Sequence, residues 1–270
     1  MISSLPRRQS SGGQPAADRD AWLVRPDARP AARLRLFCFS YAGGGASVYR
    51  PWLRELPPEI ELCAVQLPGR ENRLLEAPYA EMSALVEQLG SVIDRRLDLP
   101  FALFGHSMGA LVSFEVARQI RQRHGLSPVH LFVSGHVAPQ LKRHQTPIHH
   151  LSEPDFVEAI RRLNGTPEQV LENAELMALI LPALRADLQL CETYTCRDEP
   201  PLSCPISAFG GMADPEVRYD DLRAWQAQTS STYRLRLFPG DHFYLRDGHS
   251  ALLETIRQSL GLPMRLAVQV

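Results

Sequence analysis

Short apolar runs alternate with stretches of helical periodicity over much of the chain. Apolar runs of strand length occupy residues 34–40, 60–67, 101–104, 129–134 and 205–209, and residues 233–238 alternate apolar with charged side chains. Residues 82–97 and 111–120 carry apolar side chains at helical spacing. Strands that alternate with helices are typical of a parallel sheet covered by helices. We therefore predict an α/β fold with a mostly parallel central sheet flanked by helices.

This alternation stops after Ala138 and resumes near residue 200. The order Ser152, Glu153, Pro154 indicates a helix start, because proline is tolerated in a first turn. Helices are predicted over residues 156–163, 167–173 and 175–194, and Pro182 predicts a kink or a break in the last of them. We expect a helical lid inserted at about residues 139–200, within one domain that covers residues 21–270.

The last predicted helix is apolar over more of its surface than one core-facing stripe requires. Packing of the lid on the core and an apolar acyl-chain pocket both account for this excess. Met177 on this helix and Met212 after a strand are candidates for the pocket wall, because methionine fills irregular gaps.

Composition and charge exclude several classes of protein. A chain of 270 residues that is 44% hydrophobic can bury one large core. Its net charge of −1 favours neither nucleic acid nor an acidic membrane as partner. Five cysteines without C-x-x-C spacing predict free thiols and a cytoplasmic protein. No apolar stretch has the length of a membrane helix. Residues 1–20 lack an apolar signal segment, so we expect a disordered tail.

The most specific motif is Gly105-His-Ser107-Met-Gly109, which lies between a predicted strand and a predicted helix. This is the context of a G-x-S-x-G nucleophile elbow, in which small residues allow a strained turn that exposes the serine. The elbow places the Ser107 hydroxyl at a helix N-terminus, where the Met108 N–H is free to stabilise an oxyanion.

A serine hydroxyl needs a base, and a carboxylate orients that base. In this fold the three follow in the order Ser, Asp or Glu, His. Asp214 follows one predicted strand and His242 follows the next, and the carboxyl ends of parallel strands are where open α/β folds place their chemistry. Asp241 is a rival acid, but adjacent residues seldom orient each other in a triad. Asp214 is therefore the predicted acid, although Asp before Pro215 also forms simple turns.

Other histidines have simpler interpretations. His106 lies beside the nucleophile, so its side chain is expected to point elsewhere. His144, His149 and His150 lack the accompanying ligands of a zinc site and are interpreted as a polar loop, so no metal is predicted.

A second oxyanion donor is expected from the loop after an early strand. Residues 34–40 are followed by Tyr41, Ala42 and three glycines, which let backbone N–H groups approach a substrate. Ala42 N–H is the predicted partner of Met108 N–H. The run lacks the lysine of a phosphate loop, so nucleotide binding is not expected.

The chain resembles type II thioesterases, the free-standing editing hydrolases that accompany polyketide and non-ribosomal peptide synthetases. The resemblance covers roughly residues 33–260, and residue by residue the family's nucleophile, acid and base fall on Ser107, Asp214 and His242. One departure is Asn164, where the family often has glycine. The matching stretches are Tyr41-Ala-Gly-Gly, Leu67-Pro-Gly-Arg-Glu-Asn-Arg73, Gly105-His-Ser-Met-Gly-Ala110, Gly165-Thr-Pro167, Leu181-Pro-Ala-Leu-Arg-Ala-Asp187, Gly210-Gly-Met-Ala-Asp214-Pro and Phe238-Pro-Gly-Asp-His242-Phe.

The resemblance implies an α/β-hydrolase fold and hydrolysis of aberrant or short acyl thioesters from phosphopantetheinyl carrier proteins, through an acyl-serine. It implies a transient carrier partner, a monomer and no cofactor, since the pantetheine arm belongs to the carrier. Arg70 and Arg73 either order their loop or meet an acidic partner. The alternatives are a carboxylesterase or lipase, a medium-chain acyl-carrier-protein thioesterase, an acyltransferase or cyclase, and a non-catalytic binding protein of the same fold.

Overall fold

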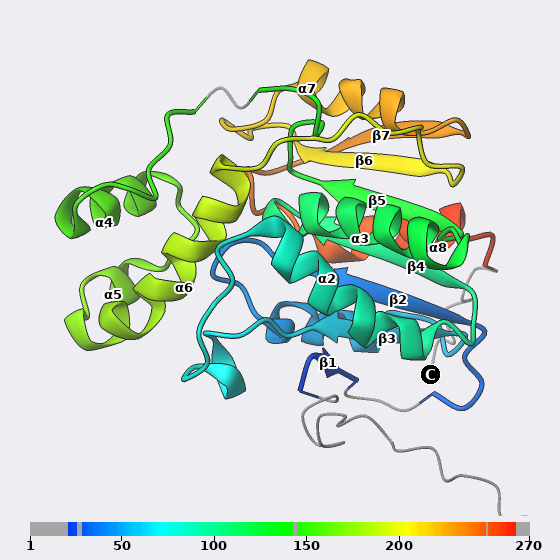
Figure 1. Cartoon of the computed structure of the whole chain (residues 1–270), viewed down its shortest axis with the longest axis horizontal. Coiled ribbons are helices and arrows are strands. Elements are labelled where there is room, and N and C mark those ends of the chain that lie inside the picture. The colour runs from blue at the N-terminus through cyan, green and yellow to red at the C-terminus, as the bar shows by residue number, and fades with distance from the viewer. Residues whose placement is uncertain (1–20, 26–28, 143–144, 247, 263–270) are drawn as a thin grey trace, which may run out of the picture.

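Seven strands form one sheet in the order β1-β3-β2-β4-β5-β6-β7 in the computed structural model, which describes residues 21–25, 29–142, 145–246 and 248–262 (Figure 1). All neighbouring pairs are parallel except β1 with β3, so the predicted mostly parallel sheet is confirmed. The tail expected at residues 1–20 lies outside the described residues. The strands are β1 Leu23–Val24, β2 Leu34–Phe39, β3 Ile60–Val65, β4 Phe101–His106, β5 His130–Ser134, β6 Ile206–Gly211 and β7 Tyr233–Phe238.

The strands β2 to β6 are buried along their whole length because both faces of the sheet are covered, as parallel sheets require. Alternate side chains therefore enter two different cores. Phe37 and Leu103 face the core under α2 (Met82–Ile93) and α3 (Met108–His124). Leu36 and Phe104 face the other core, under α8 (His249–Ser259) and the 3₁₀ helix η1 (Ala46–Arg54).

The remaining short helices are edge and connecting elements. They are η2 (Glu71–Arg73), η3 (Asp94–Arg96), α7 (Tyr219–Arg223) and η4 (Ala224–Gln228).

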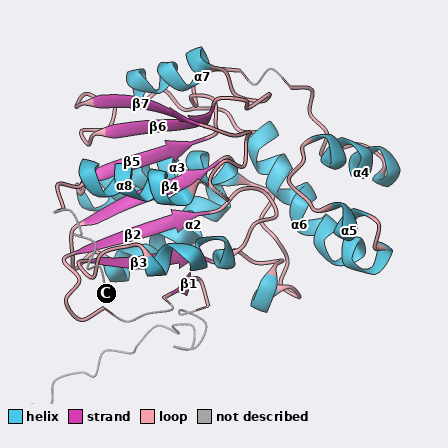
Figure 2. Ribbon diagram, turned by 180° about the vertical axis from the view of Figure 1, so that it is seen from behind, coloured by secondary structure: helices cyan, strands magenta, loops and turns pink. Residues whose placement is uncertain are grey.

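Three helices between β5 and β6 form the lid that the sequence predicts: α4 (Glu153–Arg162), α5 (Glu168–Leu171) and α6 (Ala174–Glu192). They stand beyond the carboxyl ends of the strands in both views (Figures 1 and 2). The lid has a hydrophobic cluster of its own, which includes Phe156, Met177 and Leu184. Of the kink or break predicted at Pro182, the break does not occur, because α6 continues through the proline and is buried along much of its length on both sides of it.

Candidate active site

The turn at Ser107 has the strained backbone of a nucleophile elbow. Ser107 has φ +53° and ψ −121°, a conformation that side-chain-bearing residues rarely adopt, and α3 begins at the next residue. A Cβ on Gly105 would lie 1.9 Å from the Gly109 carbonyl oxygen, and a Cβ on Gly109 would lie 2.0 Å from the Phe39 carbonyl oxygen. Both glycines are therefore needed for helix α3 to start this close to β4 and β2.

His242 and Asp214 meet although 28 residues separate them. Asp214 lies in the loop after β6 and His242 in the loop after β7, and His242 Nδ1 is 2.8 Å from Asp214 Oδ2. The other carboxylate oxygen accepts the N–H groups of Glu216 at 2.8 Å and Val217 at 3.3 Å. Because the acid is held on both oxygens and binds Nδ1, the Nε2 atom is the ring nitrogen available to take a proton.

The rival acid Asp241 serves its own turn. One of its oxygens accepts the N–H of Phe243 at 2.8 Å, and the other lies 3.5 Å from the side-chain amide of Asn164. The structure thus brings Asp214, and not Asp241, to the imidazole. Asn164, where the family often has glycine, has φ +54°, a region that asparagine enters more readily than most residues.

The loops that carry the acid and the base are joined through their backbones. Met212 N–H donates to the Phe238 carbonyl at 2.8 Å, and Ala213 N–H donates to the Gly240 carbonyl at 2.9 Å. A Cβ on Gly211 would lie 2.1 Å from the Asp241 carbonyl oxygen. This close approach fixes the spacing of the two loops before any side chain is considered.

The environment of His242 favours the protonated ring. Burial lowers the pKa of His242, but the hydrogen bond and the negative charge of Asp214 outweigh burial, so the pKa lies above its ordinary value of 6.5. A base of this kind takes up a proton readily and is stabilised as imidazolium while it holds it.

Ser107 and His242 approach the same short segment of chain after β5. The Ser107 N–H donates to the Ser134 carbonyl at 2.7 Å, and a Cβ on Gly135 would lie 3.3 Å from the His242 ring. The backbone of Ser107 and the ring of His242 therefore both lie against residues 134–135.

The loop after β2 has the shape of an oxyanion loop. Ser40 Oγ donates to the Gly44 carbonyl at 2.6 Å, and Gly44 N–H donates to the Tyr41 carbonyl at 2.9 Å. Among the described residues, no acceptor is bonded to the N–H of Ala42 or of Met108. Both predicted donors are thus available to an oxyanion.

His106 contacts the base, which its position in the sequence does not reveal. Its Nδ1 lies 2.8 Å from Ser134 Oγ, which shares a 2.6 Å hydrogen bond with the Tyr244 hydroxyl. The ring centroids of His106 and His242 are 5.1 Å apart. Burial, aided by the neighbouring His242, holds the pKa of His106 well below 6.5, so a neutral ring packs against the base.

The two arginines of the Pro-Gly-Arg loop are directed inward, so the first of their two predicted roles applies. Arg70 forms a buried ion pair with Asp187, and Arg73 pairs with Glu76 while its guanidinium lies 4.0 Å from the centre of the Trp22 ring. Both side chains order the polypeptide around them.

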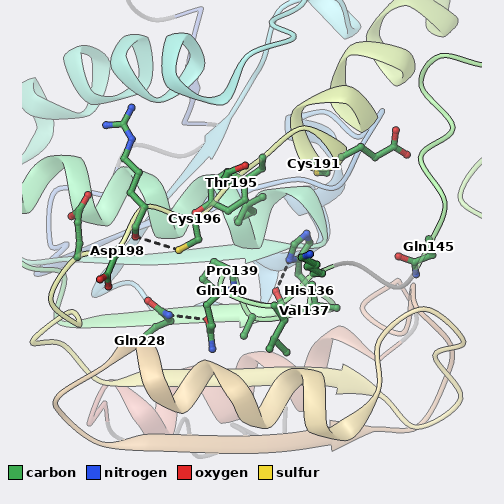
Figure 3. A pocket seen from close by; sticks show the side chains of 18 of the residues that line it. His136, Val137, Pro139, Gln140, Gln145, Cys191, Thr195, Cys196, Asp198 and Gln228 are labelled. Atoms are coloured by element: carbon green, nitrogen blue, oxygen red, sulfur yellow. Dashed lines mark hydrogen bonds between the residues drawn. The ribbon is translucent and has the colours of Figure 1, made fainter.

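The two methionines proposed as pocket walls lie in different surroundings. Met177 is buried inside the lid cluster. Met212, the first residue after β6 ends at Gly211, is 66% exposed, and this exposure does not suit a pocket wall. A pocket of about 560 Å³ lies instead between the loop after β5 and the end of α6, where His136 and Pro139 face Cys191 and Cys196 (Figure 3). None of the predicted triad residues lines it.

The structure also bears on the predictions for the other histidines, for metal and membrane sites and for the cysteines. His149 binds Glu192 at 2.5 Å, and His144 lies outside the described residues. Within the ranges that the structure describes, no cluster of His, Cys, Asp and Glu is arranged to hold a metal ion, and no helix has the length and apolar character of a membrane span. All five cysteines are free, as predicted.

Comparison with known proteins gives a consistent set of relatives. The family described as "Thioesterase domain" matches residues 34–260. The gramicidin S biosynthesis protein GrsT of Aneurinibacillus migulanus is 46% identical over 89% of this chain and 94% of its own length. Thioesterase PikA5 of Streptomyces venezuelae is 39% identical over 85% of this chain and 82% of its own. The structure of BorB, a type II thioesterase from the borrelidin biosynthetic cluster, superposes with a TM-score of 0.82 at 40% identity, over 89% of this chain and 98% of BorB.

Proposed function

Because this chain belongs to the thioesterase family, we propose that it is a type II thioesterase that removes acyl groups from the phosphopantetheine arms of carrier proteins. The observation that carries the proposal is the 2.8 Å hydrogen bond of His242 to Asp214 beside the Ser107 elbow. Similarity to GrsT, PikA5 and BorB favours a synthetase carrier over an oxygen ester as the substrate.

The first half-reaction transfers the acyl group to serine. Ser107 Oγ attacks the thioester carbonyl carbon while His242 Nε2 takes the hydroxyl proton, and Asp214 stabilises the imidazolium. The N–H groups of Ala42 and Met108 stabilise the oxyanion, each donor contributing on the order of 3 kcal/mol. The intermediate then collapses: the C–S bond breaks, and the proton on His242 passes to the leaving pantetheine thiol.

The second half-reaction returns the enzyme to its starting state. Water loses a proton to His242 as it attacks the acyl-serine, and the same two N–H groups hold the second oxyanion. The carboxylic acid leaves as Ser107 recovers its proton from His242. Every group in this scheme is a residue of the chain, so we propose catalysis without a cofactor, the pantetheine being part of the substrate.

The proposed biological role is editing. An enzyme of this kind acts in trans as a cytoplasmic monomer that docks briefly on a carrier domain and frees it from a short or aberrant acyl unit. The support is the similarity to the gramicidin S biosynthesis protein GrsT, to thioesterase PikA5 and to BorB, a type II thioesterase from a biosynthetic cluster.

The test is intact-protein mass spectrometry of an acetyl-loaded carrier protein incubated with wild-type enzyme, Ser107→Ala and Ser113→Ala. Ser113 is a matched control, because it is a buried serine on the helix that follows Ser107 and its hydroxyl donates to the Ala110 carbonyl of that helix. We expect wild type and Ser113→Ala to remove the acetyl mass, and Ser107→Ala to lose about 10⁶-fold in kcat. Persistence of the acetyl mass with wild type, alongside rapid cleavage of p-nitrophenyl esters, would favour the esterase alternative.

A further inference from the structure

The lid helix α6 carries a buried carboxylate, Asp187, that contacts the oxyanion loop directly. Asp187 is 1% exposed and binds Arg70 through both oxygens, at 2.6 Å and 2.8 Å. Its Oδ2 also accepts the N–H of Gly43 at 2.7 Å. Asp187 therefore contacts the backbone of one loop and the side chain of another. These loops lie 144 and 117 residues away from it in the sequence.

The same ion pair holds the other side of the turn. Arg70 Nη1, which binds Asp187, also lies 3.3 Å from the Gly44 carbonyl oxygen. Asp187 thus fixes the peptide N–H of Gly43, and Arg70 contacts the carbonyl of the next residue. The Ser40 hydroxyl donates to the same Gly44 carbonyl, and the Gly44 N–H donates to the Tyr41 carbonyl.

Packing strengthens this link between lid and loop. Gly43 has φ +77°, and a Cβ there would lie 2.5 Å from the Leu184 side chain on α6. Ala42 itself packs against the lid cluster. The residue that offers the oxyanion donor is therefore bounded by α6 on one side and by its own turn on the other.

We propose that Asp187 is a positioning residue for transition-state stabilisation: by holding the Gly43 N–H it keeps the adjacent Ala42 N–H directed at the oxyanion. The proposal rests on the proposed function only in taking Ala42 as an oxyanion donor. It makes the lid helix part of the catalytic arrangement, because a displacement of α6 displaces the acceptor that orients the loop.

A purely structural role would be to fasten the lid by a buried ion pair, and paired variants separate the two roles. Arg70→Met with Asp187→Asn removes both charges but keeps an amide oxygen that can accept the Gly43 N–H. Arg70→Met with Asp187→Leu removes the charges and the acceptor. Replacing both charges avoids the cost of a lone buried ion, since neutral replacements of a buried pair are often tolerated. Asp187→Ala takes the place of Asp187→Leu if the leucine variant does not fold.

The variants are compared by kcat and KM for butyryl-N-acetylcysteamine and by the inhibition constant of an alkyl trifluoromethyl ketone, whose adduct with Ser107 carries an oxyanion. We expect the acceptor-free pair to have a kcat about 10- to 100-fold below that of the amide pair, with little change in KM and an equal loss of ketone affinity. Equal kcat in the two pairs, or a difference confined to KM, would overturn the proposal.

A buried ion pair elsewhere in the sheet is the control. Arg35 on β2 bonds Glu61 on β3 at 2.6 Å, near the ends of the strands opposite the active site. Arg35→Met with Glu61→Gln should lower stability and leave kcat unchanged. The same comparison can be made with p-nitrophenyl butyrate, because hydrolysis of this oxygen ester depends on the same oxyanion hole. A failure of the carrier-substrate proposal is therefore distinguishable from a failure of the proposal for Asp187.

Discussion

A single methyl group at Gly109 should separate the two halves of the oxyanion hole. A Cβ at residue 109 would lie 2.0 Å from the Phe39 carbonyl oxygen, 2.5 Å from the Phe39 carbonyl carbon and 2.8 Å from the Ser40 carbonyl oxygen. Ordinary van der Waals contact begins near 3.4 Å, and the obstructing atoms are backbone. In Gly109→Ala, therefore, the start of α3 and the end of β2 must move apart by more than 1 Å.

This displacement acts on catalysis because each side carries one donor. Met108 precedes Gly109, and Phe39 leads into the loop that contains Ala42. A misplacement of about 1 Å costs on the order of 10²-fold in rate, and loss of one oxyanion donor costs about 10²- to 10³-fold. We expect a kcat loss of about 10²- to 10³-fold, with a destabilisation of about 1–3 kcal/mol from overpacking.

The assay measures kcat on butyryl-N-acetylcysteamine and the free energy of unfolding in urea, with Gly125→Ala as the matched control. Gly125 ends α3 at φ +65°, and nothing lies within 4 Å of a Cβ there. This control should lose about 1 kcal/mol of stability from the unfavourable φ and keep its kcat. A Gly109→Ala enzyme with wild-type kcat would refute the reasoning, and so would an equal kcat loss in Gly125→Ala.

Two further predictions concern titrating groups. Asp214→Asn removes the two largest influences that raise the pKa of His242, so the lowering effect of burial gains weight. The plateau of kcat should fall by about 10⁴-fold and the acid limb of its pH profile should move to lower pH, whereas Asp241→Asn, which removes only a weaker influence on the same pKa, should keep the plateau and move the acid limb less. His130 has its pKa lowered to about 4 by burial, so the unfolded chain binds more protons than the native one between about pH 4 and 6.5, and stability must fall as pH falls through that window. The contribution of His130 reaches about 3 kcal/mol, so between pH 7.5 and 4.5 the free energy of unfolding in urea should fall by about 3 kcal/mol more in wild type than in His130→Gln.

The features that the sequence predicted well are those with a local signal. Gly105 and Gly109 flank Ser107 because the turn is too tight for a Cβ, and this requirement is visible in five residues. The predicted acid and base follow strand ends, so chain order and strand position are enough to select Asp214 and His242, which the structure brings into hydrogen-bond contact. The strand runs and the helical insertion are likewise contained in the local pattern of apolar residues.

The features that were missed depend on packing between distant segments. Pro182 predicts a kink or a break in α6, yet tertiary packing keeps the helix continuous through it. Methionine fills irregular gaps, which favours Met212 as a pocket wall, but Met212 is exposed in the loop after β6. The contact of His106 with His242 depends on how the loops after β4 and β7 meet, which periodicity does not encode.

Asp187 shows most clearly why a charge on a lid helix is hard to interpret from the sequence. In a helical pattern an aspartate marks the solvent-facing side, yet this one is buried because Arg70 and the Gly43 N–H supply three hydrogen bonds to it. Two of the stretches that carry the family resemblance, Pro-Gly-Arg and Leu-Arg-Ala-Asp, thus meet each other at the oxyanion loop. Their function need not lie in binding a partner or a substrate. A hydrolase whose lid helix supplies the acceptor for its oxyanion loop cannot displace that helix without also altering the hole, so the position of the lid and the rate of acyl transfer should change together.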